Sequence, residues 1–308
     1  MIEILHGVER LMGVEGPVSL ALGVFDGVHI GHQKVIETAV QRAHECGGKA
    51  IVVTFEPHPI QVLAPEKAPM RILATVEHKA LLLEKLDVDV LLVAEFTPDF
   101  AKQSASDFFS LIHHPQLYSI AVGEDWKFGK GRDGDGSFLR RKGSELNVQI
   151  DLVPAVKVAG ERASSTRIRQ ALRDGNIAAA SEMLGRPYAV MGKVVTGRQL
   201  GRTIGFPTAN IEVRGEQLPP SGVWAVRAHI DGSWRQGIAN LGKRPTVEQE
   251  NVQRLLEVFI FDWEGDLYGK DLQVEFGKFI RPEKKFNGVD ELMAQITKDV
   301  EMVKQLRS

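Results

Sequence analysis

Two histidines three residues apart, His29 and His32, lie among three glycines in the segment GVFDGVHIGH, residues 23–32, directly after the apolar run VSLAL. The apolar residues that follow recur at helical spacing, so the histidines are expected at a helix N-terminus, where free amides and the helix dipole favour an anion. Gly27 and Gly31 leave room for a phosphate to approach the backbone. The segment therefore predicts a cradle for a triphosphate. Its candidate residues are Gly23, Phe25, Asp26, Gly27, His29, Gly31 and His32.

Two other interpretations of this segment stay open. The histidines are incidental if the segment is only the start of a surface helix, and at an i, i+3 spacing they could also ligate a metal. A metal site would need third and fourth ligands at a recognisable spacing, which the sequence does not offer. The chain also has no GxxxxGK[ST] segment, so a P-loop does not explain triphosphate binding.

A second segment, SSTRIR, residues 164–169, combines hydroxyls with arginine. The segment resembles a signature of the HxGH nucleotidyltransferase superfamily, which implies that Ser165 and Thr166 cap a helix and also bond phosphate, while Arg169 neutralises charge. The alternative is a capped helix start with no further role.

Two loops that follow predicted strands supply candidates for an acceptor site. In TFEPHP, residues 54–59, Phe55, Pro57 and His58 could line a pocket, although a proline-rich turn is the plainer interpretation. The segment GEDWKFGKGRDGDG carries glycines in GxGxxG spacing, but no helix follows at once, so it is not a dinucleotide fingerprint. We interpret it as a mobile substrate loop with Asp125 at its root.

The elements that must position these residues fall into two patterns. Up to about residue 186, buried strand-like runs alternate with helical ones, which predicts an α/β domain with a doubly wound parallel sheet. From residue 187, short alternating runs separated by glycine and proline predict an antiparallel β-barrel closed by a terminal helix. The predicted domains are residues 1–186 and 187–308.

Composition limits the classes of partner. The 308 residues carry a net charge of -2, so no global charge attracts nucleic acid or anionic membranes. The single cysteine, Cys46, excludes an internal disulfide and a thiolate metal cluster. No signal peptide or membrane-spanning run is apparent. We expect a cytoplasmic protein with small-molecule partners, no nucleic acid and no membrane; a homo-oligomer is possible.

The motifs carry a resemblance. GVFDGVHIGH and SSTRIR resemble the two signatures of the HxGH nucleotidyltransferase superfamily, and GRTIGFPTANI, residues 201–211, resembles the flavokinase signature. With NLGKRPT, LEVFIFDWEGDLYG and RPEKKF in the same order, the whole chain is similar to the bacterial bifunctional riboflavin kinases/FAD synthetases. The departures are mild: Ala163 replaces an aliphatic residue that commonly precedes the two serines, and some family members carry asparagine at the position of Asp125.

The resemblance implies two reactions. The N-terminal domain would adenylylate FMN with ATP, giving FAD and pyrophosphate, and the C-terminal domain would phosphorylate riboflavin with ATP, giving FMN. It implies Glu257 as the kinase's catalytic base and Mg²⁺ held at Thr208 and Asn210. The residues that would bind ATP in the kinase are Gly201, Gly205, Pro207, Thr208 and Asn210, and Arg281 and Phe286 would lie near the flavin.

Each of these kinase assignments has a plainer alternative: a turn entering a strand at residues 205–210, a solvated strand glutamate at Glu257, and a basic turn at residues 281–286. Two rival functions also stay open. One is an enzyme with a single active half, and the other is a flavin or nucleotide sensor without catalysis.

Overall fold

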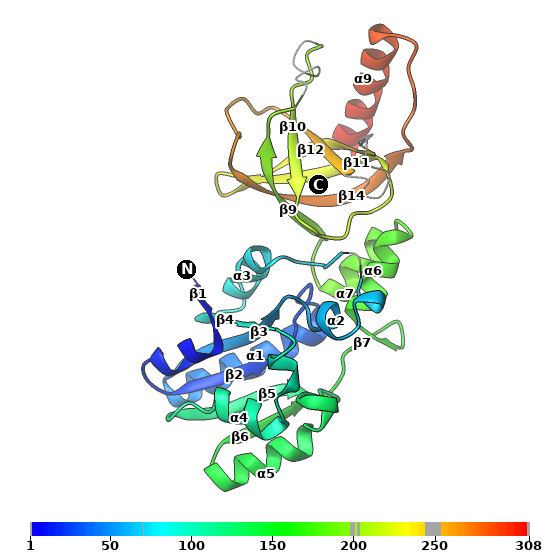
Figure 1. Ribbon diagram of the computed structural model, residues 1–308. Helices are drawn as coiled ribbons and strands as arrows, with labels where there is room; N and C mark the ends of the chain where they lie inside the picture. The colour runs from blue at the N-terminus through cyan, green and yellow to red at the C-terminus, as the bar shows by residue number, and fades with distance from the viewer. Residues whose placement is uncertain (1, 70, 198–200, 202–203, 244–253, 307–308) are drawn as a thin grey trace. The chain divides into compact units, whose positions relative to one another are not determined.

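The computed structural model describes residues 2–69, 71–197, 201, 204–243 and 254–306, and it divides into two compact units, residues 1–165 and 166–308. The first unit is built on a parallel sheet and the second on an antiparallel barrel, so the predicted fold class is confirmed (Figure 1). The functional boundary at residues 186 and 187 stays a prediction. Among the described residues, no helix is both long and apolar enough to cross a membrane.

The sheet of the first unit has six parallel strands in the order β1-β4-β3-β2-β5-β6. Its central strands are buried on both faces, which explains why VSLAL is a continuous apolar run rather than an alternating one. The carboxyl ends of β2, β3 and β5 share one edge, which brings the loops with the predicted motifs together. The strands are β1 (Glu3–His6), β2 (Val18–Leu22), β3 (Lys49–Glu56), β4 (Val90–Glu95), β5 (Leu117–Gly123) and β6 (Gln149–Val153).

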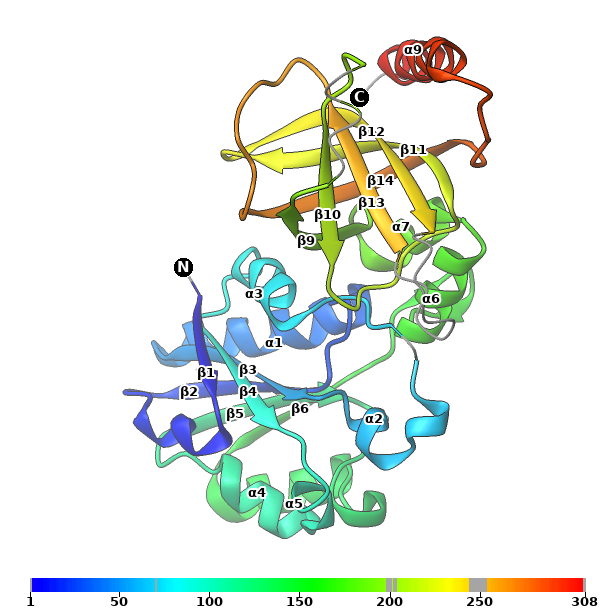
Figure 2. The ribbon, with the colours of Figure 1, turned by 45° about the horizontal axis from the view of Figure 1, so that its top comes forward.

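Helices cover both faces of this sheet. Figures 1 and 2 show α1 (Ile30–Cys46) and α3 (Val76–Glu84) on one face, and α4 (Ala105–Ile112) and α5 (Gly136–Leu146) on the other. Two apolar clusters fill the layers between helices and sheet. The buried face of α1 consists of the residues whose spacing predicted it: Val35, Ile36, Ala39, Val40 and Ala43.

Short elements complete the first unit. These are α2 (Pro59–Leu63), the 3₁₀ turns η1 (Val8–Gly13), η2 (Pro65–Lys67), η3 (Phe100–Lys102) and η4 (Lys130–Arg132), and the hairpin of β7 (Lys157–Val158) and β8 (Glu161–Arg162).

The second unit holds α6 (Ser165–Arg173), whose first residue ends the first unit, α7 (Ile177–Leu184), and a closed six-stranded barrel in the order β10-β13-β12-β11-β14-β9. Closure leaves no unpaired strand edge in the barrel. The terminal helix α9 (Val289–Gln305) packs against β12, with Val303 in an apolar cluster beside Val223 and Ile238. The strands are β9 (Ala189–Val195), β10 (Thr208–Val213), β11 (Gly222–Ile230), β12 (Ser233–Lys243), β13 (Arg254–Ile260) and β14 (Asp271–Arg281).

Candidate active sites

The two histidines of the first motif lie together at the N-terminus of α1. His29 is the N-cap residue, and its Nδ1 accepts a hydrogen bond of 3.3 Å from the amide of His32. The two rings stack with their centroids 3.5 Å apart and an interplanar angle of 20°. Because Nδ1 of His29 accepts this bond, it carries no proton, and Nε2–H is the donor of the neutral ring. The cap therefore fixes the tautomer of a buried imidazole at a site suited to anions.

The turn between β2 and α1 is strained. Phe25 and Val28 have φ values of 50° and 42°, in the left-handed region that a β-branched residue rarely adopts. Gly27 has φ of 79°, and a Cβ there would lie 2.8 Å from the Cβ of Leu73. Such a conformation persists only where its surroundings hold it.

The buried carboxylate of Asp26 provides one such restraint. Its Oδ1 accepts hydrogen bonds from the amides of Leu73 at 2.8 Å and Ala74 at 3.3 Å. The amide of Gly23 bonds the carbonyl of Val53 on β3 at 3.2 Å. A Cβ on Gly31 would lie 3.2 Å from the ring of His29, so this glycine also makes space for the imidazole.

The second motif contacts the first. The Oγ of Ser165 donates a hydrogen bond of 2.9 Å to the main-chain carbonyl of Asp26, which joins two segments separated by 139 residues. Ser165 begins α6, where Thr166 is exposed and Arg169 is buried. Within the first unit, the hydroxyl thus holds Ser165, the last residue of that unit, to the turn that leads into α1.

The acceptor candidates lie at the same edge of the sheet. Phe55 is buried among Phe96, Phe100 and Phe108, with ring centroids 5.9 to 6.2 Å apart. Pro57 follows a cis peptide bond, and His58 caps α2 through Nδ1. Phe55 is therefore a core residue at the root of this loop rather than a residue of its open surface.

Asp125 forms an ion pair with Arg162, which the sequence reasoning did not single out. The contact has two hydrogen bonds, of which the one from Nη2 to Oδ1 is 2.9 Å long. These bonds hold the pKa of Asp125 below its ordinary value. Further along the same loop, Trp126 stacks on Phe128 with centroids 4.6 Å apart, and Phe128 forms a β-bridge to Gly134. Phe128 thus ties the loop to the core, and the mobility we expected of it stays a prediction.

In the second unit, Glu257 lies between two asparagines on neighbouring strands. On β13 it is in register with Asn210 of β10 on one side and with Asn240 of β12 on the other. Leu256 and Val258 are fully buried whereas Glu257 is half-buried, which is the alternation expected for a strand. Directly opposed residues have Cβ atoms about 5 Å apart, so two amides flank the carboxylate.

The remaining residues of the kinase motif lie close to β10. Thr208 begins this strand, and a Cβ on Gly201 would lie 3.3 Å from its Oγ1. The amide of Phe206 bonds the carbonyl of Gly201 at 2.8 Å, which holds Gly201 close to the residues that lead into the strand. Residues 202 and 203 of this motif, and 244–246 of NLGKRPT, lie outside the described residues.

Arg281 is held by a contact with α9, and Phe286 lies beside Arg281. Arg281 donates from Nε to the buried carboxylate of Asp299 at 2.8 Å. The ring of Phe286 lies 5.7 Å from the guanidinium of Arg281 and 5.4 Å from the ammonium of Lys284. The structure thus places these two flavin candidates together, in a loop braced by two cations.

Two known protein families match this chain. The FAD synthetase family matches residues 13–167, and the riboflavin kinase family matches residues 184–307. The bifunctional riboflavin kinase/FMN adenylyltransferase of Escherichia coli K12 is 40% identical over 302 residues, covering 96% of this chain and 95% of that protein. The protein of the same name from Bacillus subtilis is 38% identical, covering 97% and 95%. The chain belongs to the bifunctional riboflavin kinase/FMN adenylyltransferase family.

A solved structure has the same fold over its whole length. The crystal structure titled a macrolide-efflux protein from Streptococcus pneumoniae superposes with a TM-score of 0.84 at 30% identity, covering 99% of this chain and 100% of that one. As a riboflavin kinase and FMN adenylyltransferase, the chain is an enzyme of flavin cofactor biosynthesis. It uses ATP, converts riboflavin to FMN, and converts FMN to FAD.

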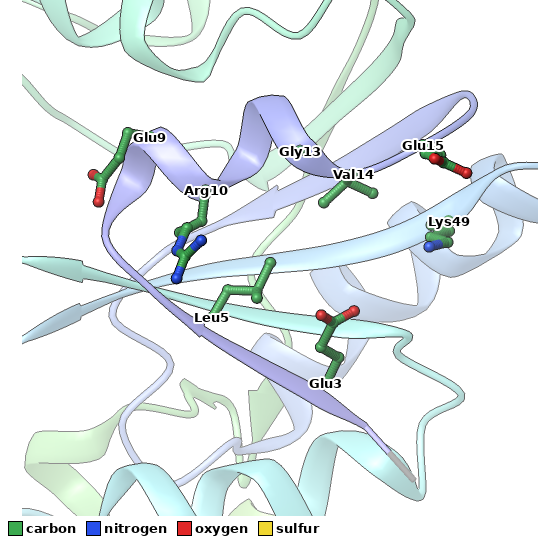
Figure 3. A pocket seen from close by; sticks show the side chains of 8 residues that line it. All are labelled: Glu3, Leu5, Glu9, Arg10, Gly13, Val14, Glu15 and Lys49. Carbon is green, nitrogen blue, oxygen red and sulfur yellow. The ribbon is translucent and has the colours of Figure 1, made fainter.

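A cavity of about 480 Å³ in the first unit lies apart from the predicted residues of this riboflavin kinase/FMN adenylyltransferase. Glu3, Glu9, Arg10, Glu15 and Lys49 line it together with Leu5, Gly13 and Val14, and Figure 3 shows their side chains. Lys49 is the first residue of β3, so the cavity lies toward the amino ends of the strands, away from the edge with the motifs. None of the predicted site residues belongs to it.

The structure also adds residues that sequence reasoning missed. Asn240 begins the NLGKRPT motif, but the motif alone does not indicate a role for it. Only the strand register places it beside Glu257. Arg162 lies directly before the Ala163–Ser164 pair, a position that could have drawn notice. Lys79 sits in the helical run EHKALLLEKL, where a lysine usually indicates a solvated face, yet it is 4% exposed.

Proposed function

We propose that residues 23–32, with Ser165, Thr166 and Arg169, bind ATP for adenylyl transfer, and that Thr208, Asn210 and Glu257 carry out the kinase reaction. The observation that carries the first assignment is the bond from Ser165 to the carbonyl of Asp26, which ties the start of the second motif to the turn that precedes α1. The second rests on the register of Glu257 with Asn210. The proposed functional domains remain residues 1–186 and 187–308.

Adenylyl transfer in this scheme needs no covalent protein nucleophile. A phosphate oxygen of FMN attacks the α-phosphorus of ATP, the bond to the β-phosphate breaks, and pyrophosphate leaves. The protein's task is to position the reactants and stabilise charge that accumulates on the phosphates. His29 and His32, the amides of the first turn of α1, and Arg169 are the donors for that charge, and Gly23, Phe25, Asp26, Gly27 and Gly31 shape the turn.

The flavin of this reaction is assigned to the edge where the loops after β3 and β5 meet. Pro57 and His58 follow β3 directly, and the stacked Trp126 and Phe128 follow β5. Aromatic rings bury large apolar area in specific geometries, which suits a planar ring system. In this assignment, Phe55 packs behind the flavin site, and Asp125, which is paired with Arg162, lies at the edge of the site.

In the kinase reaction, Glu257 takes the proton from the ribityl 5'-hydroxyl as its oxygen bonds the γ-phosphorus of ATP; the bond from that phosphorus to the β-phosphate oxygen breaks, and ADP leaves. General bases contribute about 10²- to 10⁴-fold to such a step. Thr208 and Asn210 offer hydroxyl and amide oxygens on the strand beside this carboxylate, the hard ligands that Mg²⁺ prefers. When bound, Mg²⁺ neutralises phosphate charge. Arg281 and Phe286 are assigned to the flavin side, and Gly201, Gly205 and Pro207 to ATP.

The adenylyltransferase assignment is tested by His32→Ala. Loss of one donor to a developing charge typically raises a barrier by about 2.7 to 4 kcal/mol, so FAD formation from FMN should fall at least a hundredfold. FMN formation from riboflavin, measured in the same preparation, should stay unchanged, which shows that the second unit is folded and active. An unchanged rate of FAD synthesis would remove His32 from the site.

The kinase assignment is tested by Glu257→Gln, which keeps shape and removes the base. FMN formation should stop, while supplied FMN is still converted to FAD. Robust kinase activity in this variant would exclude Glu257 as the base.

Both assignments place two activities in one chain, and a time course with riboflavin, ATP and Mg²⁺ checks this directly. FMN should rise first and then decline as FAD accumulates. FMN alone would indicate a single active half, and neither product would favour a sensor. We propose the cytoplasm as the location, with riboflavin, FMN and ATP as small-molecule partners.

A further inference from the structure

A buried lysine supports the turn that precedes α1. Lys79 of α3 is 4% exposed, and its Nζ donates to the main-chain carbonyl of Val24 at 2.9 Å and to Oγ1 of Thr54 at 2.8 Å. Thr54 in turn donates to the same carbonyl at 2.8 Å. The ammonium therefore joins the carboxyl end of β2 to β3 from a helix that lies on one face of the sheet.

The charge of this lysine is costly, so packing alone does not explain it. Burial lowers the pKa of Lys79 to about 8, while the charges of Asp26 and Glu56 act in the opposite direction. An apolar side chain of similar length would fill the same space without the loss of hydration. The ammonium must therefore contribute something that an apolar side chain would not.

The segment that Lys79 holds is the strained one. Val24 directly precedes Phe25, and the turn ends at Val28. Phe25 and Val28 both have positive φ. Asp26, in the middle, is anchored to the amides of Leu73 and Ala74, a few residues before α3. Lys79 of α3 thus restrains the turn at Val24, and the amides of Leu73 and Ala74, just before α3, restrain it at Asp26.

We propose that Lys79 is a positioning residue of the adenylyltransferase site, whose ammonium group fixes the Val24–Val28 turn and offsets the charge of Asp26 so that the turn can receive the phosphates of ATP. The proposal rests on the assignment of residues 23–32 to that site. A carboxylate in this turn would repel ATP, and in a buried environment the repulsion is several-fold stronger than in water. The ammonium of Lys79 bonds Val24, two residues before Asp26, and its positive charge cancels much of the electrostatic repulsion between Asp26 and the phosphates.

The wild-type enzyme provides the first test through its alkaline pH dependence. Within the described residues, Asp26 and Glu56 act on the charge of Lys79, and Glu77 acts on Glu56. Glu95 is in register with Glu56, His78 precedes Lys79 in the chain, and His29 and His32 lie at the N-terminus of α1, the helix that follows the turn. A decline above pH 8 that disappears when Lys79 is replaced belongs to Lys79. About a tenth of Lys79 stays charged one unit above its pKa, so kcat/KM for ATP in FAD synthesis should fall about tenfold from pH 7 to pH 9. A flat profile would overturn the proposal.

Two variants separate positioning from simple structural support. Lys79→Met should raise the KM for ATP about tenfold at pH 7, keep kcat at saturating ATP within about threefold, and lose the alkaline decline. Lys79→Arg, which stays charged throughout, should restore part of the affinity and also remove the decline. A Met variant with unchanged KM, or with the wild-type pH profile, would refute the role.

Matched controls complete the design. Lys85→Met removes an exposed lysine at the end of the same helix and should leave both KM and the profile unchanged. Thr54→Val removes one acceptor of Lys79 but keeps the charge, so the alkaline decline should persist. If FAD synthesis survives in His32→Ala, the site assignment fails; if His32→Ala is inactive while Lys79→Met equals wild type, only the role of Lys79 fails.

Discussion

Gly27→Ala tests whether the turn before α1 depends on its close approach to Leu73. The methyl group would lie 2.8 Å from Cβ and 2.9 Å from Cδ1 of Leu73, on a backbone with φ of 79°. The left-handed conformation costs a non-glycine residue about 1–2 kcal/mol, and overpacking adds about 1–3 kcal/mol. We therefore expect a loss of roughly 2–5 kcal/mol in the local free energy of unfolding.

A matched glycine isolates the contribution of the contact. Gly16 has a similar φ of 87°, but a Cβ there would meet nothing within 4 Å. Gly16→Ala should therefore lose only the conformational part, about 1–2 kcal/mol. The difference between the two variants measures the clash with Leu73.

Hydrogen exchange followed by mass spectrometry suits this comparison because it reports each unit of the molecule separately. Exchange in β2 and β3 should accelerate more in Gly27→Ala than in Gly16→Ala, whereas β11 and β12 should exchange as in the wild type. FAD synthesis should fall in Gly27→Ala while riboflavin phosphorylation persists. Equal exchange in the two variants would mean that Leu73 yields at little cost, and the reasoning about this turn would be refuted.

Two further predictions concern charged groups. Asp299→Ala should destabilise the barrel and α9 by about 3–5 kcal/mol, because it leaves the Arg281 guanidinium without its buried partner; unchanged exchange in α9 would contradict this. Lys79 is protonated in the unfolded chain but not in the folded one between pH 8 and 10.5, so unfolding free energy should rise with pH there. The wild type should gain about 3 kcal/mol relative to Lys79→Met over that range, and parallel stability curves for the two proteins would show that the lysine is not buried in solution.

The sequence was most informative where a local pattern decides the structure. The spacing of His29 and His32 predicted their shared position at a helix N-terminus, and the alternation around Glu257 predicted its face, because both depend on a few neighbouring residues. The buried apolar run of β2 and the change to alternating runs after residue 186 predicted the two kinds of sheet in the same way.

The residues that sequence reasoning missed depend on distant parts of the chain. Asn240 lies beside Glu257 only because of the register between β12 and β13, which no local pattern specifies. Lys79 is buried because α3 packs against the sheet and the ammonium finds acceptors at Val24 and Thr54, which lie far from it in sequence. From the motif alone, Gly31 was predicted to leave room for a phosphate. The structure adds a second reason for a glycine here, because a side chain would crowd the ring of His29.

The bond between Ser165 and Asp26 has a consequence for the order in which the protein is made. Its two partners are separated by 139 residues, so the ribosome completes all six strands of the first sheet before Ser165 emerges. A nascent chain that ends before this residue can already bury the apolar core of its sheet, but its turn still lacks the contact with the second motif. The free energy of closing so long a loop grows only slowly with its length, and it is smallest once the folded sheet has brought the ends together. The turn before α1 can therefore gain this contact only after all six strands of the sheet have been synthesised.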